Sequence, residues 1–257
     1  MQLKTPLLAI SLCAMAVPLH AQNWEGWHAG LQFGGISAEG QHNITEDGFE
    51  NFDLDAPTKL DEIEGGLVGI RAGRDWMRGS LVFGAEAEIS KAGNGVNQFS
   101  AVNDTSDNVG EFYETEISGL GSIRGRVGYL VGAEQNTLLY GLAGLAAADI
   151  RASNGDADDA DPDPGTIDLV ADCDTATGAC AEASDTVFGY TIGFGVEHQL
   201  PDVQFGGGNL SVGLEYAYYD YGDAELSTTT TEANPADHEF DVDLSAHTLQ
   251  AVLRLRF

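Results

Sequence analysis

The chain has 257 residues, of which 43% are hydrophobic, and a formal net charge of −30. This acidic balance argues against nucleic-acid binding, because phosphate contacts need clustered lysines and arginines. After residue 21 no apolar run approaches the ~20 residues that a transmembrane helix needs. A membrane-spanning form of this chain would therefore have to be a closed β-sheet, in which every backbone polar group is paired.

The amino-terminal segment 1–21 has the features of a secretory signal peptide. Lys4 supplies a positive charge, Leu7–Val17 is an apolar run broken only by Ser11, and Ala21 offers a small residue before the expected cleavage. The apolar run reaches only about half the length that spans a bilayer. We expect residues 1–21 to be removed, which leaves residues 22–257 as a single domain with a charge of −30 − 1 = −31, because Lys4 is the only charge lost.

From residue 24 onward, eight segments alternate apolar and polar side chains with the period of two that is typical of half-buried β-strands. In the first segment, Trp27 and Phe33 share one side; in the fourth, Ile117, Ile123 and Tyr129 are expected to share one side. The expected segments are 24–38, 65–76, 80–92, 112–131, 137–151, 186–200, 209–223 and 245–257.

The last segment and the connections together predict the fold class. Leu249, Leu253 and Leu255 alternate with Arg254 and Arg256, as lipid-facing and lumen-facing side chains alternate in a transmembrane barrel. The seven connections alternate long and short, which is typical of short periplasmic turns and long surface loops with both termini on the periplasmic side. The sequence predicts an all-β, eight-stranded antiparallel up-and-down barrel in a Gram-negative outer membrane.

Acidic side chains are concentrated in the expected loops. Residues 39–62 hold eight acids against Lys59, and residues 152–185 hold ten acids with no lysine or arginine. The aspartate run from Asp156 to Gly165 lacks the glycine and the glutamate of an EF-hand loop, so diffuse attraction of divalent ions is favoured over a specific calcium site. We expect no metal site, and no cofactor is indicated.

Nine charged side chains share the parity that would face the lumen if the apolar parity faces lipid. They are Arg71, Glu86, Glu88, Arg124, Arg126, Glu197, Glu215, Arg254 and Arg256. Buried charge costs several kcal/mol per ion unless it is paired and hydrogen-bonded, and the interior of an eight-stranded barrel is just wide enough for side chains to fill. The pattern therefore favours an Arg/Glu network that seals the barrel; a polar pore for small solutes is the alternative.

Seven motifs, in chain order, resemble strands of the OmpA-like small outer-membrane β-barrel family. They are WEGWHAGLQFGG (24–35), GAEAEI (84–89), SIRGRVGY (122–129), LYGLAG (139–144), GFGVEH (193–198), LEYAYYDYG (214–222) and HTLQAVLRLRF (247–257). Within the family, the sequence is most similar to surface-antigen and "porin family" proteins of alphaproteobacteria. The resemblance implies that Phe257 is part of the signal read by the barrel-assembly machinery. It also implies periplasmic chaperones as transient partners, and a monomer surrounded by outer-membrane lipid and lipopolysaccharide.

Cys173 and Cys180 lie in the longest acidic loop, with six residues between them. Cys13 leaves with the signal peptide, so an even pair remains in an oxidising compartment, which predicts a local disulfide. A zinc site is the competing interpretation, but two cysteines without nearby histidines do not make one.

Eight aromatic side chains are candidates for the interfacial girdles that set the depth of a barrel in the bilayer. They are Trp24, Trp27, Trp76, Tyr129, Tyr140, Tyr190, Tyr216 and Tyr218.

The function favoured by the sequence is structural and surface-presenting. Small-solute transport, and an adhesin or host-factor or divalent-ion binder acting through the acidic loops, are the alternatives. Catalysis is not expected: Ser245 and His247 share the outward side near Asp243, but the chain has no nucleophile elbow, and a serine and a histidine two residues apart often occur by chance.

Overall fold

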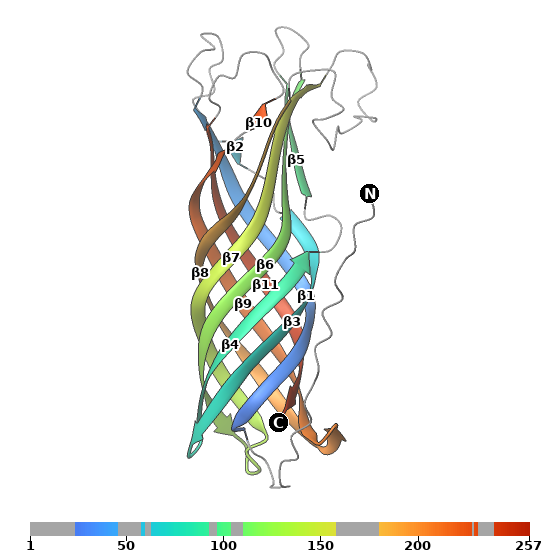
Figure 1. The fold of residues 1–257 in the computed structure, drawn as a ribbon, viewed down its shortest axis with the longest axis vertical. Helices are drawn as coiled ribbons and strands as arrows, with labels where there is room; N and C mark the ends of the chain where they lie inside the picture. Colours follow the sequence, from blue (N-terminus) through green and yellow to red (C-terminus); the bar gives the residue numbers. More distant parts are fainter. Residues whose placement is uncertain are drawn as a thin grey trace, which may run out of the picture.

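The computed structural model describes residues 24–45, 58–59, 63–92, 97–103, 110–157, 180–227, 229–230 and 239–257. These residues form one antiparallel sheet that closes on itself into a long barrel (Figure 1). The barrel strands are β1 (Gly26–Thr45), β3 (Ile63–Arg78), β4 (Leu81–Ala92), β6 (Gly110–Val131), β7 (Thr137–Ala157), β8 (Cys180–Phe205), β9 (Gly208–Ser227) and β11 (Glu239–Arg256). Short strands β2 (Thr58–Lys59), β5 (Asn97–Asn103) and β10 (Thr229–Thr230) pair with β1, β6 and β8.

Each barrel strand pairs with its two neighbours along the chain, and β11 pairs with β1 to close the ring. The seam runs from His28 opposite Arg256 to Thr45 opposite Glu239. The predicted eight-stranded antiparallel barrel is therefore confirmed. No helix in the described part of the chain is long and apolar enough to cross a bilayer.

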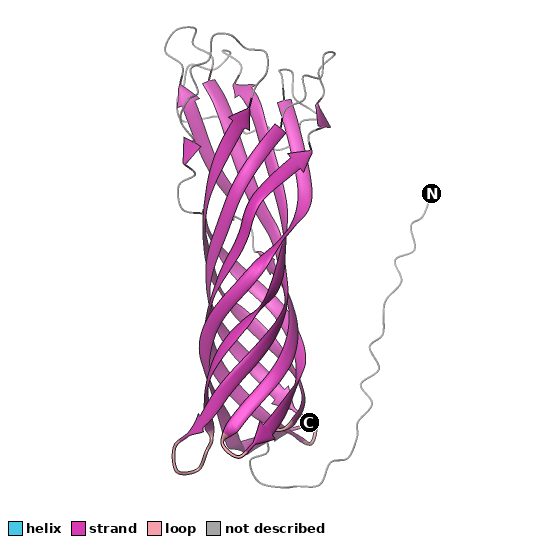
Figure 2. Cartoon of the chain, turned by 90° about the vertical axis from the view of Figure 1, so that its left-hand side faces the viewer, coloured by secondary structure: helices cyan, strands magenta, loops and turns pink. Residues whose placement is uncertain are grey.

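Three tight connections lie at one end of the barrel, together with the carboxy-terminus (Figures 1 and 2). We call this the turn end; its connections are residues 79–80, 132–136 and 206–207. Gly206 and Gly207 have φ values of +60° and +84°, which a two-residue type I′ hairpin requires at both central positions. Apart from residues 1–23, the residues that the structure does not describe belong to the other four connections. They include Cys173, most of the aspartate run and much of the acid-rich sequence. The structure does not describe the side chain of Cys180 either, so the disulfide between Cys173 and Cys180 stays a prediction.

The strands extend well beyond the expected segments at the end opposite the turns. Strand β8 has 26 residues and β6 has 22, whereas about 9–11 residues cross a bilayer as a tilted strand. Backbone pairing therefore continues past the point where the apolar alternation stops. Near the turn end the outward side chains are large and apolar, as with Phe194 and Ile123, whereas Ser118 and Asp185 are exposed polar side chains further along.

One expected orientation is wrong because of a β-bulge. The register between β6 and β7 shifts between Ile117 and Gly119, and a bulge inserts one residue and so reverses the alternation beyond it. Ile117 is therefore buried in the interior, whereas Ile123 and Tyr129, which were expected on the same side, are exposed on the outside.

Two of the expected girdle aromatics also point inward. Trp24 and Tyr140 are 0% and 4% exposed, because Tyr140 shares the inward parity of Leu138 and Leu142, and Trp24 lies inside the turn end. Trp27, Trp76, Tyr129 and Tyr190 are exposed on the outer surface, and Tyr216 and Tyr218 are half-buried there.

Candidate functional site in the barrel interior

The interior is stacked in three layers along the barrel axis. The first, at the turn end, is an apolar layer of Trp24, Val82, Leu130, Leu138, Tyr140 and Leu142. The middle layer is charged. The third, beyond it, is a larger apolar layer built from Ile36, Ala38, Leu67, Ala92, Ile117, Leu120, Ala146, Ala148, Ile150, Val187, Ala217, Tyr219, Tyr221, Leu244 and Ala246. The charged layer is therefore enclosed by apolar side chains on both sides.

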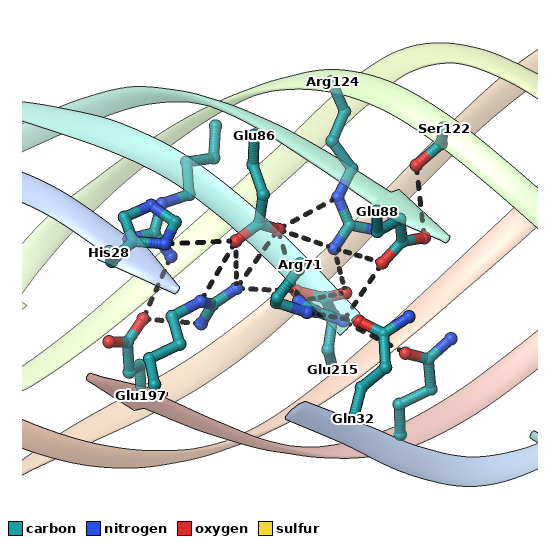
Figure 3. A network of polar contacts seen from close by, with 12 residues as sticks. His28, Gln32, Arg71, Glu86, Glu88, Ser122, Arg124, Glu197 and Glu215 are labelled. Atoms are coloured by element: carbon teal, nitrogen blue, oxygen red, sulfur yellow. Dashed lines mark hydrogen bonds and ion pairs between the residues drawn. The ribbon is translucent and has the colours of Figure 1, made fainter. Parts of the chain in front are cut away.

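All nine charged residues expected in the lumen are buried in the middle layer and form ion pairs there. Figure 3 shows the side chains of Arg71, Glu86, Glu88, Arg124, Glu197 and Glu215 in this layer. The side of this layer nearer the large apolar layer is centred on two guanidiniums. Arg71 contacts Glu86 at 3.3 Å, Glu88 at 3.1 Å and Glu215 at 3.1 Å. Arg124 contacts the same three carboxylates at 2.8, 3.0 and 2.7 Å. Because these groups come from β3, β4, β6 and β9, the cluster ties together strands across the lumen.

The side nearer the turn end contains Arg126 and Arg256, both of which share Asp75 and Glu197. Arg126 pairs with Asp75 and lies 2.9 Å from Glu197. Arg256 lies 2.8 Å from Asp75 and 3.2 Å from Glu197. Arg254 connects the two halves of the layer.

Arg254 contacts carboxylates from both halves: Glu197 at 2.7 Å, Glu86 at 3.0 Å and Glu215 at 3.5 Å. Removing Arg254 would therefore separate the network into two clusters. Its guanidinium also lies 5.7 Å from the centre of the Tyr140 ring, and the Tyr140 hydroxyl donates a hydrogen bond to Glu215 at 2.7 Å.

Asp75 is the functional residue that the sequence reasoning missed. With it, the middle layer contains five arginines (71, 124, 126, 254 and 256) and five carboxylates (75, 86, 88, 197 and 215). Its parity was the available signal, because Asp75 lies four residues after Arg71 and so on the same face of β3. The opposite charges are therefore equal in number, which is how a narrow interior can hold so many ions.

Neutral polar side chains provide many of the remaining hydrogen bonds of the network. Gln32 accepts from Arg71, and Gln250 accepts from the same guanidinium at 3.0 Å. Ser211 donates to Glu197 at 2.6 Å, and Tyr219 donates to Glu88 at 2.7 Å. Burial of a charge is tolerated when its lone pairs and protons are satisfied in this way.

His28 lies between the two halves of the charged layer. Its Nε2 is 3.6 Å from Asp75 and its Nδ1 is 3.7 Å from Glu86. Neither ring nitrogen has a hydrogen-bond partner within the described residues. The ring therefore fills space beside the network without a hydrogen bond of its own.

Inward-facing glycines make room for the long charged side chains. A Cβ atom at Gly30 would lie 3.1 Å from Cγ of Arg254 and 3.2 Å from Cγ of Arg71. At Gly84 a Cβ atom would collide with the carboxylate of Asp75. These glycines are thus part of the packing of the network.

Phe257, Ser245 and His247 lie outside the charged layer. The backbone N–H of Phe257 donates to the carbonyl of Trp27 at 2.8 Å, beside the seam; its role in assembly stays a prediction. Ser245 and His247 are half-buried on the outer surface, and the side chain of Asp243 is outside the description. Nδ1 of His247 is hydrogen-bonded to the Tyr216 hydroxyl at 2.7 Å.

Within the described ranges, no group of three or more histidine, cysteine, aspartate or glutamate side chains could hold a metal ion. Most of the run of aspartates near residue 160 lies outside these ranges.

A closed antiparallel barrel with apolar side chains outside and paired charges inside defines a transmembrane β-barrel protein. The outer membrane protein beta-barrel domain family matches residues 5–257, so the chain belongs to this family and is an outer-membrane protein.

Known proteins that are similar to the chain include one relative in sequence and one solved structure. The 22 kDa outer membrane protein of Rhizobium leguminosarum bv. viciae is 29% identical over 203 residues, a match that covers 78% of this chain and 66% of that protein, just under two thirds of its length. The crystal structure of OprG from Pseudomonas aeruginosa has a TM-score of 0.52 at 11% identity and covers 93% of this chain and 99% of that one. The second likeness shows the fold alone.

Proposed function

We propose that this protein is a structural and surface-presenting barrel whose interior is closed to solutes. The observation that supports closure best is the burial of the charged side chains. Arg254 is 0% exposed, Glu197 1% and Arg71 2%. Since a conducting pore needs its polar lining in contact with water, these exposures favour a filled interior over a channel.

The two apolar layers add a second barrier. Leu244 and Ala246 on one side and Leu138 and Trp24 on the other are each 0% exposed. A hydrated ion or sugar would have to displace these side chains as well as break the ion pairs between them. The small-solute channel is therefore the less favoured function, and it is tested directly by the conductance measurement described in the Discussion.

The distribution of outward side chains supports an orientation with the turn end in the periplasm. Exposed apolar residues such as Phe83 and Val196 cover the outside near the turn end, and the polar part of the barrel projects beyond them at the other end. In this orientation the acidic connections face the medium. They would repel anions and attract divalent ions that bridge lipopolysaccharide.

Cysteine labelling of intact cells tests this orientation. In a background with Cys173 and Cys180 replaced by serine, an Asp185→Cys variant is expected to react with a membrane-impermeant maleimide. Ala133→Cys, in the 132–136 turn, is expected to react only after the outer membrane is opened; both positions are exposed. Labelling of Ala133→Cys but not of Asp185→Cys in intact cells would show that the barrel has the opposite orientation.

The proposal also covers the oligomeric state and the partners of the protein. We expect a monomer in contact with outer-membrane lipid and lipopolysaccharide, delivered by periplasmic chaperones to the barrel-assembly machinery. No catalytic role is proposed for His247, since its Nδ1 is engaged by the Tyr216 hydroxyl and the ring packs against Tyr216 and Tyr218 with centroid distances of 6.0 and 5.0 Å.

A further inference from the structure

An arginine lies among tryptophans on the outer surface near the turn end. Arg74 faces outward from β3, directly opposite Trp27 of β1. Its guanidinium carbon is 5.4 Å from the centre of the Trp27 ring and 5.5 Å from that of Trp76. Trp76 in turn stacks on Phe83 with 6.1 Å between ring centres. We call Arg74, Trp27, Trp76 and Phe83 the rim cluster.

Arg74 differs from the arginines of the charged layer. Those five arginines point inward and are paired with carboxylates, whereas Arg74 is exposed and makes no ion pair with any carboxylate in the described ranges. Arg78, four residues further along β3, is also exposed on the outer side. In a chain with a net charge of −30, the rim cluster therefore presents an exposed guanidinium among aromatic rings on the outer surface.

The surroundings of Arg74 match one kind of ligand. Cation–π contact orients the guanidinium while leaving its N–H donors available. A guanidinium binds phosphate oxygens through two parallel hydrogen bonds. On the same strand, exposed Ile70 and Val68 continue away from the turn end. On β4, exposed Phe83 lies opposite Trp76 and exposed Ile89 lies opposite Ile70. An anionic headgroup at Arg74 would thus have apolar surface beside it for acyl chains.

We infer that the rim cluster binds the phosphate of an anionic glycerophospholipid, such as phosphatidylglycerol, in the membrane leaflet at the turn end. That this leaflet is the periplasmic one rests on the proposed orientation. The chemistry of the site does not depend on that orientation. The ligand is anionic because the rim cluster contributes a guanidinium and aromatic faces, and Arg74 makes no ion pair with a carboxylate in the described ranges. Arg74 is the residue that recognises the phosphate, and the tryptophans position it.

Fluorescence quenching by brominated lipid tests the site. The protein is placed in nanodiscs of phosphatidylcholine with increasing fractions of phosphatidylglycerol, with bromine on the acyl chains of one lipid at a time. Trp27 and Trp76 are exposed to lipid, whereas the third tryptophan, Trp24, is fully buried and contributes constant emission. Phosphatidylglycerol is expected to quench at about fivefold lower fraction than phosphatidylcholine, the size expected for one cation at an anionic membrane surface.

Matched variants identify the residue responsible. Arg74→Gln is expected to bring the ratio of the two lipids to about one, whereas Lys91→Gln, which removes an exposed cation near the far end of β4, should keep the preference. Arg74→Lys retains the positive charge but lacks the planar guanidinium, so it should give an intermediate ratio. If Arg74→Gln does not fold, the Arg74→Lys variant tests whether Arg74 recognises the phosphate.

Three outcomes would overturn the inference. They are equal quenching by both lipids in the parent protein, an unchanged preference in both Arg74 variants, and loss of the preference on addition of millimolar inorganic phosphate, which would indicate a site for free anions. Nanodisc leaflets have the same composition, so this result does not depend on orientation. Cysteine labelling in cells decides orientation separately.

Discussion

Replacing Glu86 with alanine is expected to lower the free energy of unfolding by about 3–5 kcal/mol, the cost of leaving buried charge unpaired. Glu86 lies within ion-pair distance of Arg71, Arg124 and Arg254, at 3.3, 2.8 and 3.0 Å. Its removal leaves three guanidiniums with one carboxylate fewer between them, in a layer that water cannot reach without opening the barrel. Urea unfolding of the protein in lipid vesicles, followed by tryptophan fluorescence, measures the change.

Glu64→Ala is the matched control for this experiment. Glu64 is a carboxylate on the exposed face of β3, and exposed substitutions away from special contacts usually change stability by about 0.5 kcal/mol or less. If the two variants were equally stable, the charged layer would not contribute to stability in the way described here.

A double-mutant cycle on Asp75 and Arg126 is expected to show strong coupling. Asp75→Ala alone should cost about 3–5 kcal/mol, because Arg126 and Arg256 both lose a buried partner. Arg126→Met alone should also be costly, since Asp75 and Glu197 lose one cation. The double variant removes one charge of each sign, so its cost should fall below the sum of the single costs by about 0.5–3 kcal/mol.

Glu64 supplies the control for the cycle. It is exposed on the outer face of β3, eleven positions along the strand from Asp75, so Glu64→Ala combined with Asp75→Ala should be additive within about 0.5 kcal/mol. Additivity in the Asp75–Arg126 cycle as well would mean that the pair acts as two independent charges, contrary to the contacts described above.

Much of the interior could be predicted from the alternation alone. Because successive side chains of a strand point to opposite faces, the parity of residues such as Arg124 and Glu215 is sufficient to place them in the lumen. Asp75 obeys the same rule, but it lies one residue before Trp76, the last residue of the expected strand, where it is easily assigned to the turn. Ile117 could not be placed, because a bulge reverses the parity and leaves no signal in composition.

The pairing of the charges could not be predicted, because it depends on the register and tilt of the barrel. Arg71 and Glu215 are 144 residues apart and meet across the lumen. The parity of the two residues indicates that both side chains point inward. It does not indicate that they lie at the same level along the barrel axis. The strand ends beyond the expected segments were also missed, since outward side chains there, such as Glu64 and Asp185, are polar and show no apolar alternation.

Single-channel recording in planar lipid bilayers tests closure of the interior most directly. The purified barrel, inserted at neutral pH, should give no steady conductance above that of the protein-free bilayer, because the ion-paired layer and the two apolar layers leave no continuous path for hydrated ions. A large, steady conductance that scales with the number of inserted molecules would contradict a sealed interior and would make the protein a channel.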